Sequence, residues 1–221
     1  MTEQKSTLYL TNWLPDSPQA TFLNLRKKAS DLWNHADWKP YLSTKEGVQV
    51  EKLLFPGDPI PYIRSQVTLA SSAPEVASYV ILDKQAQVEW DPTVDRVIEW
   101  VASGNHKILQ IPCDTGKIPL IRHRDMVYYE GYERHPNGSV YSVAQSVNAP
   151  DIPILPGAIR GELCFVMRNS VAIDEDNCRL ETIWQTNMKG RIPQNFTTKG
   201  SAKTLRQESI NFQKKFGAGP S

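Results

Sequence analysis

The stretch DMVYYEGYERHPNGSVYSVAQSV, residues 125–147, shows most clearly what kind of fold this chain adopts. It contains two strand-like runs, 125–134 and 140–147, on either side of Pro136-Asn137-Gly138. Asn-Gly between two such runs is a strong local signal of a β-hairpin, because both residues accept the positive φ of a tight turn. We therefore predict an antiparallel pair here. Outward from it, the same kind of pattern predicts further strands at 96–102, 106–113, 159–173 and 179–188.

Helices are predicted before and after this β-rich part. Ser17 followed by Pro18 is typical of a helix start, and apolar residues then recur at helical spacing, so a first helix should span 18–34. A capping-box pattern opens a second helix at 72–82, which a short third one follows, and the last helix should span 198–216. Short strands are expected at 38–42, 48–55 and 63–70. The resulting order of elements predicts an α+β fold with a large antiparallel sheet.

Length, charge and cysteine content narrow the class of protein. The chain has 221 residues and no linker-like segment, which favours one domain over 1–221 with flexible ends of about 15 and about 5 residues. Its formal net charge is +1, with acids and bases interspersed, which argues against a general nucleic-acid binder. The three cysteines are odd in number and lack metal-ligand spacing, so a reducing compartment fits best. No run of residues has the pattern of a signal peptide or a membrane span.

Five short motifs occur in a fixed order between residues 90 and 193. They are Trp90-Asp91-Pro92, Arg124-Asp125-Met126-Val127, Ser146-Val147, Gly157-Ala158-Ile159-Arg160-Gly161 and Asn187-Met188-Lys189-Gly190-Arg191-Ile192-Pro193. Each motif alone is weak. Together, in this order and at these spacings, they resemble the START family, the lipid-transfer domains related to the steroidogenic acute regulatory protein. The order of elements predicted above agrees with the helix-grip fold of that family over nearly the whole chain.

The resemblance implies a curved antiparallel sheet of about nine strands around a long C-terminal helix, with an internal lipid tunnel between them. START domains carry sterols, phospholipids or ceramides between membranes, and most are not enzymes. We therefore expect a cytoplasmic monomer that binds one lipid in a ligand-sized cavity and transfers it through transient membrane contact. No cofactor, metal or nucleic-acid partner is expected. The alternatives are a helix-grip enzyme of the cyclase or hydrolase type acting on a hydrophobic ligand, and a lipid sensor with a protein partner.

Side-chain alternation along strands, phased by the resemblance, predicts the residues that line the tunnel. On the strands they are Ile111, Cys113, Met126, Tyr128, Glu130, Ser142, Ala144, Leu163, Phe165, Thr182 and Trp184. On the last helix, residues at spacings of three and four form one stripe, and those expected at the tunnel are Leu205, Ser209 and Phe212. An ordinary core-facing stripe has the same pattern. In this fold the two interpretations merge, because the core-facing side of the helix is the roof of the tunnel.

Four charged residues in this region need an explanation. Related domains have an arginine in the region of Glu130, and an unpaired charge in an apolar cavity is very costly. Glu130 should therefore contact a polar group of the ligand, or else pair with a protein cation or point outward. Asp125 follows Arg124 directly, and an acid beside an arginine stays ionised and is a poor base, which favours a structural ion pair over a catalytic one. Arg160 is a second candidate partner for Asp125.

The loop 114–123 contains an apolar run between Lys117 and Arg122. The resemblance implies a membrane gate formed by Ile118, Pro119, Leu120 and Ile192. Apolar side chains ringed by basic ones suit an anionic membrane surface. We expect this loop to touch the bilayer, and the alternative is a buried loop that covers the end of the sheet.

Overall fold

The computed structural model describes residues 14–43, 47–114 and 122–219. Its helices are α2 (Pro18–Trp33), α3 (Ala73–Ala77), the π-helix η2 (Ser78–Leu82), α4 (Gln87–Trp90) and α5 (Gln194–Phe216). Its strands are β1 (Lys39–Ser43), β2 (Gln49–Leu53), β3 (Tyr62–Leu69), β4 (Ile98–Ser103), β5 (His106–Cys113), β6 (Arg124–Arg134), β7 (Val140–Ser146), β8 (Ile159–Arg160), β9 (Glu162–Ala172) and β10 (Cys178–Asn187). The ends expected to be flexible lie partly outside the described residues.

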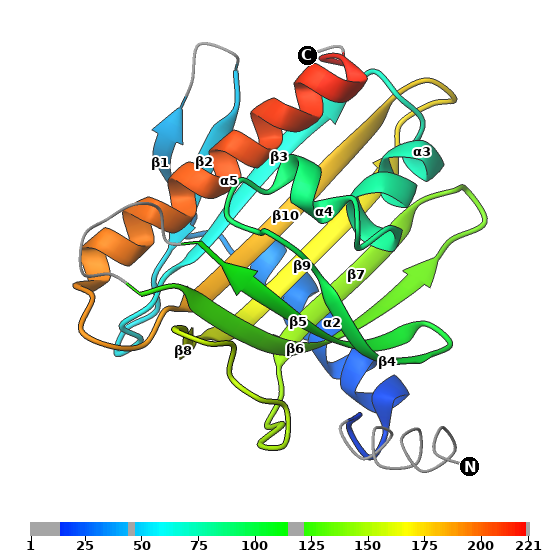
Figure 1. The fold of residues 1–221 in the computed structure, drawn as a ribbon. Coiled ribbons are helices and arrows are strands. Elements are labelled where there is room, and N and C mark those ends of the chain that lie inside the picture. The colour runs from blue at the N-terminus through cyan, green and yellow to red at the C-terminus, as the bar shows by residue number, and fades with distance from the viewer. Residues whose placement is uncertain (1–13, 44–46, 115–121, 220–221) are drawn as a thin grey trace, which may run out of the picture.

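The described strands form one sheet in the order β1-β2-β3-β10-β9-β7-β6-β5-β4, with β8 added beside β6. Neighbours along this path are antiparallel, and the two-residue β8 runs parallel to β6. Figure 1 shows α5, drawn in orange to red, crossing one face of the sheet and α2, drawn in blue, behind the other. The predicted α+β fold, with a large antiparallel sheet and a C-terminal helix across it, is confirmed.

The quoted stretch forms the β6–β7 hairpin that its sequence predicts. The turn is closed by the His135 amide, which donates to the Ser139 carbonyl at 2.9 Å. Asn137 Oδ1 accepts from the Ser139 amide at 3.1 Å, and Gly138 has a φ of 82°. A side chain is strained at such a φ, whereas glycine is not. The turn residues therefore determine where β6 ends and β7 begins.

Different helices cover the two faces of the sheet. On the side that we call the α2 face, Phe22 and Leu25 of α2 pack against Val127, Tyr129 and Val143 of the central strands. On the opposite side, the α5 face, the sheet packs against α3, η2, α4 and α5. Because side chains alternate along a strand, the residues between those named above point to the α5 face. This places the candidate site between the sheet and α3 to α5.

Two predicted boundaries differ most from the structure, whereas the other element ends shift by at most two residues and the predicted helix 72–82 is divided into α3 and η2. The predicted strand 159–173 is divided at Gly161 into β8 and β9, and β8 pairs with the start of β6. A Cβ on Gly161 would lie 3.3 Å from the Met126 methyl, so the close approach of the chain to β6 favours glycine at this position. The second difference is that α5 begins at Gln194 rather than at Thr198. None of the helices in the described ranges is long and apolar enough to cross a membrane.

Candidate functional site

A small cavity lies between the sheet and the helices of the α5 face. Its volume is about 50 Å³, and its walls come from five strands, β5, β6, β7, β9 and β10, and from the segment 80–91. Such a volume holds only a few water molecules. The expectation of a ligand-sized cavity is therefore not met in this structure, because side chains fill most of the space between the sheet and the helices. A lipid would need this space to widen.

Much of the predicted tunnel lining borders this cavity. The predicted residues on its wall are Ile111, Cys113, Met126, Tyr128, Glu130, Ala144, Leu163 and Trp184. Residues on its wall that the sequence reasoning did not select are Val80, Lys84, Gln87, Trp90, Asp91, Val166 and Arg168. The apolar residues Ile111 and Met126 are opposite each other on β5 and β6, whereas Glu130 lies further along β6. The cavity thus has an apolar end and a polar end.

The prediction for Phe165 is wrong about its side of the sheet. Phe165 lies on the α2 face, where its ring centroid is 6.2 Å from that of Tyr62. The pairing of β9 with β10 shifts register near Cys164. A one-residue irregularity of this kind reverses which side chains face the helices beyond it. As a result, Val166 and Arg168 take the places at the cavity that strict alternation assigns to their neighbours.

The predicted stripe of α5 is buried, but it lies beside the cavity rather than on its wall. Leu205 packs in an apolar cluster formed with β2 and β3. Ser209 Oγ lies 3.3 Å from Ser65 Oγ of β3. The ring of Phe212 packs against that of Trp90 with centroids 5.2 Å apart. The stripe therefore holds α5 against the sheet edge and α4, and its direct contact with a ligand stays a prediction.

Glu130 faces the cavity and pairs with a protein cation. Lys84 Nζ donates to Glu130 Oε1 at 2.6 Å, and the two side chains are 10% and 7% exposed. Burial lowers the pKa of Lys84, and the nearby carboxylate opposes this effect. The pKa of Tyr128 is raised well above its ordinary value, mainly by burial and also by the nearby charge of Glu130. The phenol therefore stays protonated.

A second buried ion pair connects α5 to the sheet. Arg168 Nη2 donates to Glu208 Oε2 at 3.0 Å, and the guanidinium lies 4.5 Å from the centroid of the Trp90 ring. The Glu208 side chain is 0% exposed, and burial raises its pKa to about 7, although Arg168 acts in the opposite direction. Two further predicted residues, Ser142 of β7 and Thr182 of β10, are opposite Arg168 in the sheet. They are buried on the α5 face without bordering the cavity.

The sequence contains a signal for one of the residues that were missed. Glu208 follows Leu205 by three positions and precedes Phe212 by four, which places it on the same side of the helix. An acid on an otherwise apolar stripe indicates a buried partner. No comparable signal marks Arg168, whose orientation depends on the irregularity in β9, or Lys84, whose partner is distant in sequence.

Several buried polar atoms near the cavity have no hydrogen-bond partner among the described residues. They are Glu130 Oε2, Arg168 Nη1, Glu208 Oε1, Trp90 Nε1 and Trp184 Nε1. All of these residues except Glu208 border the cavity. Buried polar groups in proteins are nearly always bonded, so a cluster of unsatisfied ones calls for water or a ligand. The polar end of the cavity is therefore the part best suited to a polar group of a ligand.

Arg124 and Asp125 have separate structural partners. Arg124 Nε donates to the Met188 carbonyl at 2.5 Å, which connects β6 to the loop before α5. Asp125 is 0% exposed and accepts from Arg160 Nη2 at 3.2 Å and from Gln110 Nε2 at 3.0 Å. Arg160 is thus confirmed as a partner of Asp125, whereas the adjacent arginine is not. These bonds fix the ends of β6 and β8 and leave no acid–base pair open to a substrate.

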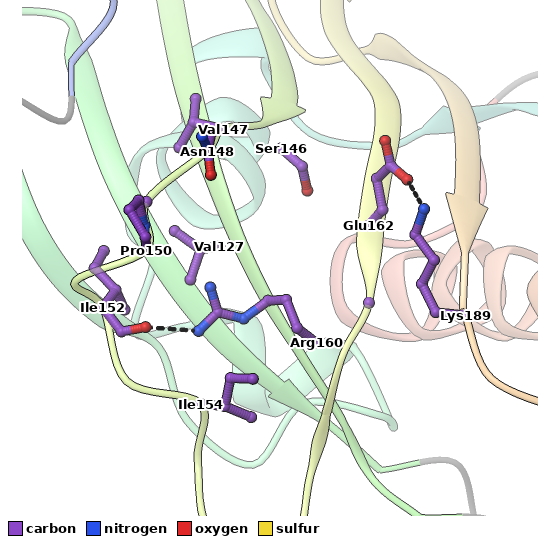
Figure 2. A pocket seen from close by; sticks show the side chains of 12 residues that line it. Val127, Ser146, Val147, Asn148, Pro150, Ile152, Ile154, Arg160, Glu162 and Lys189 are labelled. Atoms are coloured by element: carbon purple, nitrogen blue, oxygen red, sulfur yellow. Dashed lines mark hydrogen bonds and ion pairs between the residues drawn. The ribbon is translucent and has the colours of Figure 1, made fainter.

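A larger hollow of about 480 Å³ lies at the surface, where the loop between β7 and β8 meets β9. Figure 2 shows the Arg160 side chain pointing toward this loop and Lys189 paired with Glu162. Arg160 Nη2 donates to the Ile152 carbonyl at 2.9 Å. Val127 lines the hollow from the α2 face, so the hollow is separate from the cavity. No residue predicted for the tunnel lines it.

The gate prediction is largely untested by the structure. Ile118, Pro119 and Leu120 lie outside the described residues. Ile192 is half-buried in the short loop before α5. The contact of these four residues with a membrane stays a prediction.

The side chains on the cavity wall limit the chemistry that the cavity offers. No histidine is found on its wall in the part of the chain that the structure describes. Burial raises the pKa of the Cys113 thiol, which keeps it protonated and unreactive. The described residues also contain no cluster of three or more His, Cys, Asp or Glu side chains that could hold a metal ion. The wall thus combines apolar side chains with a few polar groups around a space that would have to widen before it held a lipid.

The family model of the START domain matches residues 25–217, which include the whole described sheet and all of α5. The chain belongs to the START domain family. The family resemblance seen in the sequence motifs is therefore confirmed. Among curated proteins, no match to this START domain was found.

Solved structures show the same fold. Human StAR-related lipid transfer protein 5 is 21% identical, with a TM-score of 0.79 over 88% of this chain and 93% of that one. Human STARD10 is 17% identical, with a TM-score of 0.73 over 90% of this chain and 80% of that one. The StAR-related lipid transfer protein from Xanthomonas axonopodis is 20% identical, with a TM-score of 0.63 over 80% of this START domain and 97% of that chain. At these identities the likeness establishes the fold.

Proposed function

We propose that this START domain binds one lipid in the cavity of the α5 face and transfers it between membranes. The observation that carries the proposal is the cavity itself, with an apolar end at Ile111 and Met126 and unsatisfied polar atoms at Glu130 and Arg168. Membership of the START family supports lipid binding, and similar structures are named as lipid transfer proteins. The lipid class and the transfer step are parts of the proposal.

Uptake of a lipid requires the cavity to widen. A volume of about 50 Å³ does not hold an alkyl chain, so the segment 80–91 that covers the cavity must move away from the sheet, together with α5 that packs beside it. Burial of each CH₂ group from water is worth about 0.8 kcal/mol, but a lipid that leaves a bilayer is already out of water. The free energy gained by burying the alkyl chain in the protein is therefore nearly equal to that lost when the chain leaves the bilayer. The polar end of the cavity must therefore provide most of the selectivity.

Contact with the membrane is the second part of the proposal. We expect the loop 114–123 and Ile192 to touch the bilayer and to open the cavity there, with the apolar side chains in the interface. The domain should act as a monomer in a reducing, cytoplasmic environment, which fits its free cysteines, two of them buried. Because Lys84, Glu130 and Arg168 of the cavity wall are held in ion pairs, we favour binding over catalysis.

The same chemical change at two positions tests where the lipid binds. Ala144 lies on the cavity wall, and Ala149 lines the surface hollow. Both are buried, so replacing either with leucine should cost about 1–3 kcal/mol in stability. Ala144→Leu should fill the cavity and lower uptake of a fluorescent lipid from vesicles by roughly tenfold. Ala149→Leu should leave uptake close to the wild-type level.

Native mass spectrometry of the protein purified from a lipid-containing host provides the companion measurement. We expect one lipid per wild-type chain and per Ala149→Leu chain, and little for Ala144→Leu. Thermal unfolding of both variants checks that they are folded. Loss of uptake in Ala149→Leu with normal uptake in Ala144→Leu would place the lipid in the surface hollow and refute the proposed site.

A further inference from the structure

The charged groups on the cavity wall itself are equal in number and opposite in sign. The wall contains two cations, Lys84 and Arg168, and two carboxylates, Glu130 and Asp91. Glu208 adds a third carboxylate from α5 through its bond with Arg168. A buried site without an excess of cations gains nothing from an anionic ligand, because the ligand's charge would lose its water without an opposite charge to replace it.

Each ion pair leaves specific atoms unused. Lys84 occupies Oε1 of Glu130 and leaves Oε2 as an acceptor. Arg168 donates through Nη2 and leaves Nη1 as a donor. Asp91 contributes no open acceptor of this kind, because Oδ1 accepts from Thr93 and Oδ2 accepts from the Gln87 side chain. The open positions at the cavity thus include both a donor and an acceptor.

The two indole groups extend this pattern. Trp184 is opposite Val166 on β9, which is in turn opposite Ala144 on β7 and then Glu130 on β6. In this row across four strands, the smaller apolar side chains of Ala144 and Val166 lie between the Glu130 carboxylate and the Trp184 indole. Neighbouring strands lie about 4.8 Å apart, so a polar group above this row is within side-chain reach of both ends. The Nε1 atoms of Trp184 and Trp90 are further unused donors.

We propose that the buried end of the ligand is an uncharged group that both donates and accepts hydrogen bonds, such as a hydroxyl or an amide. This inference rests on the proposed function and names its ligand class. A sulfate, phosphate or carboxylate only accepts, so it leaves Glu130 Oε2 unsatisfied and adds a negative charge beside three carboxylates. An ammonium only donates, so it leaves Arg168 Nη1 unsatisfied. A hydroxyl or amide satisfies both atoms without adding charge.

Three probes with the same alkyl chain test the inference. Hexadecanol, hexadecyl sulfate and hexadecylamine are offered separately at equal mole fraction in phosphatidylcholine vesicles. The protein is then separated from the vesicles, and the lipid that it retains is measured by mass spectrometry. We expect the wild-type protein to retain hexadecanol about tenfold more than either charged probe, as one unpaired buried group implies. Equal or better retention of a charged probe would overturn the inference while leaving lipid binding intact.

Variants of the Glu130 pair sharpen the test. Glu130→Gln leaves Lys84 without its carboxylate, so the ratio of retained hexadecyl sulfate to hexadecanol should rise about tenfold. Glu133→Gln is the matched control, since it makes the same change on the same strand at a partly exposed pair with Arg26. It should leave the ratio unchanged. An unchanged ratio in folded Glu130→Gln protein would also overturn the inference.

The double variant Lys84→Met with Glu130→Gln covers the case in which the single variant does not fold. It removes both charges together, so hexadecanol retention should fall while neither charged probe gains. A gain in hexadecyl sulfate there would overturn the inference. If no variant and no wild-type protein retains any of the three probes, and native mass spectrometry finds no bound lipid, the proposed function itself fails.

Discussion

Glu208 offers a way to measure how strongly the site between α5 and the sheet is shielded from water. Its side chain is 0% exposed, and Arg168 is its ion-pair partner at 3.0 Å. Burial raises the pKa of this carboxyl from 4.5 to about 7 despite the arginine. Glu208→Gln keeps the shape of the side chain and removes its proton equilibrium. A comparison of the two proteins across pH therefore isolates the titration of this one group.

The sign of the effect follows from the raised pKa. The folded protein binds the proton of Glu208 more tightly than the unfolded chain does. The contribution of this group to stability is therefore complete below the ordinary pKa of 4.5 and is lost as the pH rises through about 7. Between pH 4.5 and about 7, the free energy of unfolding of the wild-type protein should fall by about 3 kcal/mol more than that of Glu208→Gln.

Urea unfolding from about pH 5 to about pH 8 measures the difference directly, because other titrating groups contribute equally to both proteins. The variant also leaves Arg168 without its carboxylate partner. That cost is the same at every pH, so it lowers the variant's free energy of unfolding by a constant amount and does not change how that free energy varies with pH. Parallel curves for the two proteins would show that the carboxyl is ionised throughout the range, and the reasoning from burial would then be refuted.

Two further predictions concern stability. Phe165→Ala should lower the free energy of unfolding, measured by urea titration, by about 3–5 kcal/mol, because Phe165 is 0% exposed. The folded variant should still retain lipid normally, because the Phe165 side chain lies on the α2 face. Impaired lipid retention in folded protein would place Phe165 at the cavity. Arg160→Met should cost about 3 kcal/mol by removing the cation beside fully buried Asp125. The same change at Arg26, in a partly exposed pair, should cost less than about 1 kcal/mol, and equal losses would contradict the role of burial.

The order of elements and most of the cavity wall could be predicted from the sequence. The turn at Asn137-Gly138 and the helix start at Ser17-Pro18 depend on local chemistry, which the sequence contains in full. Alternation along β6 likewise placed Met126, Tyr128 and Glu130 on one side of the sheet, because no irregularity interrupts that strand's pairing with β5. Where a rule depends only on neighbours in the chain, the residues were sufficient to apply it.

The partners of the buried charges were decided by the tertiary structure alone. Lys84 and Glu130 are 46 positions apart, and Arg168 and Glu208 are 40 apart, so no local pattern connects them. The irregularity near Cys164 that turns Phe165 to α2 and Arg168 to the cavity arises from the pairing of two strands. The width of the cavity depends on how closely the segment 80–91 packs on the sheet. A sequence pattern specifies which side of an element is buried, but the atom that a buried charge meets depends on how whole elements pack together.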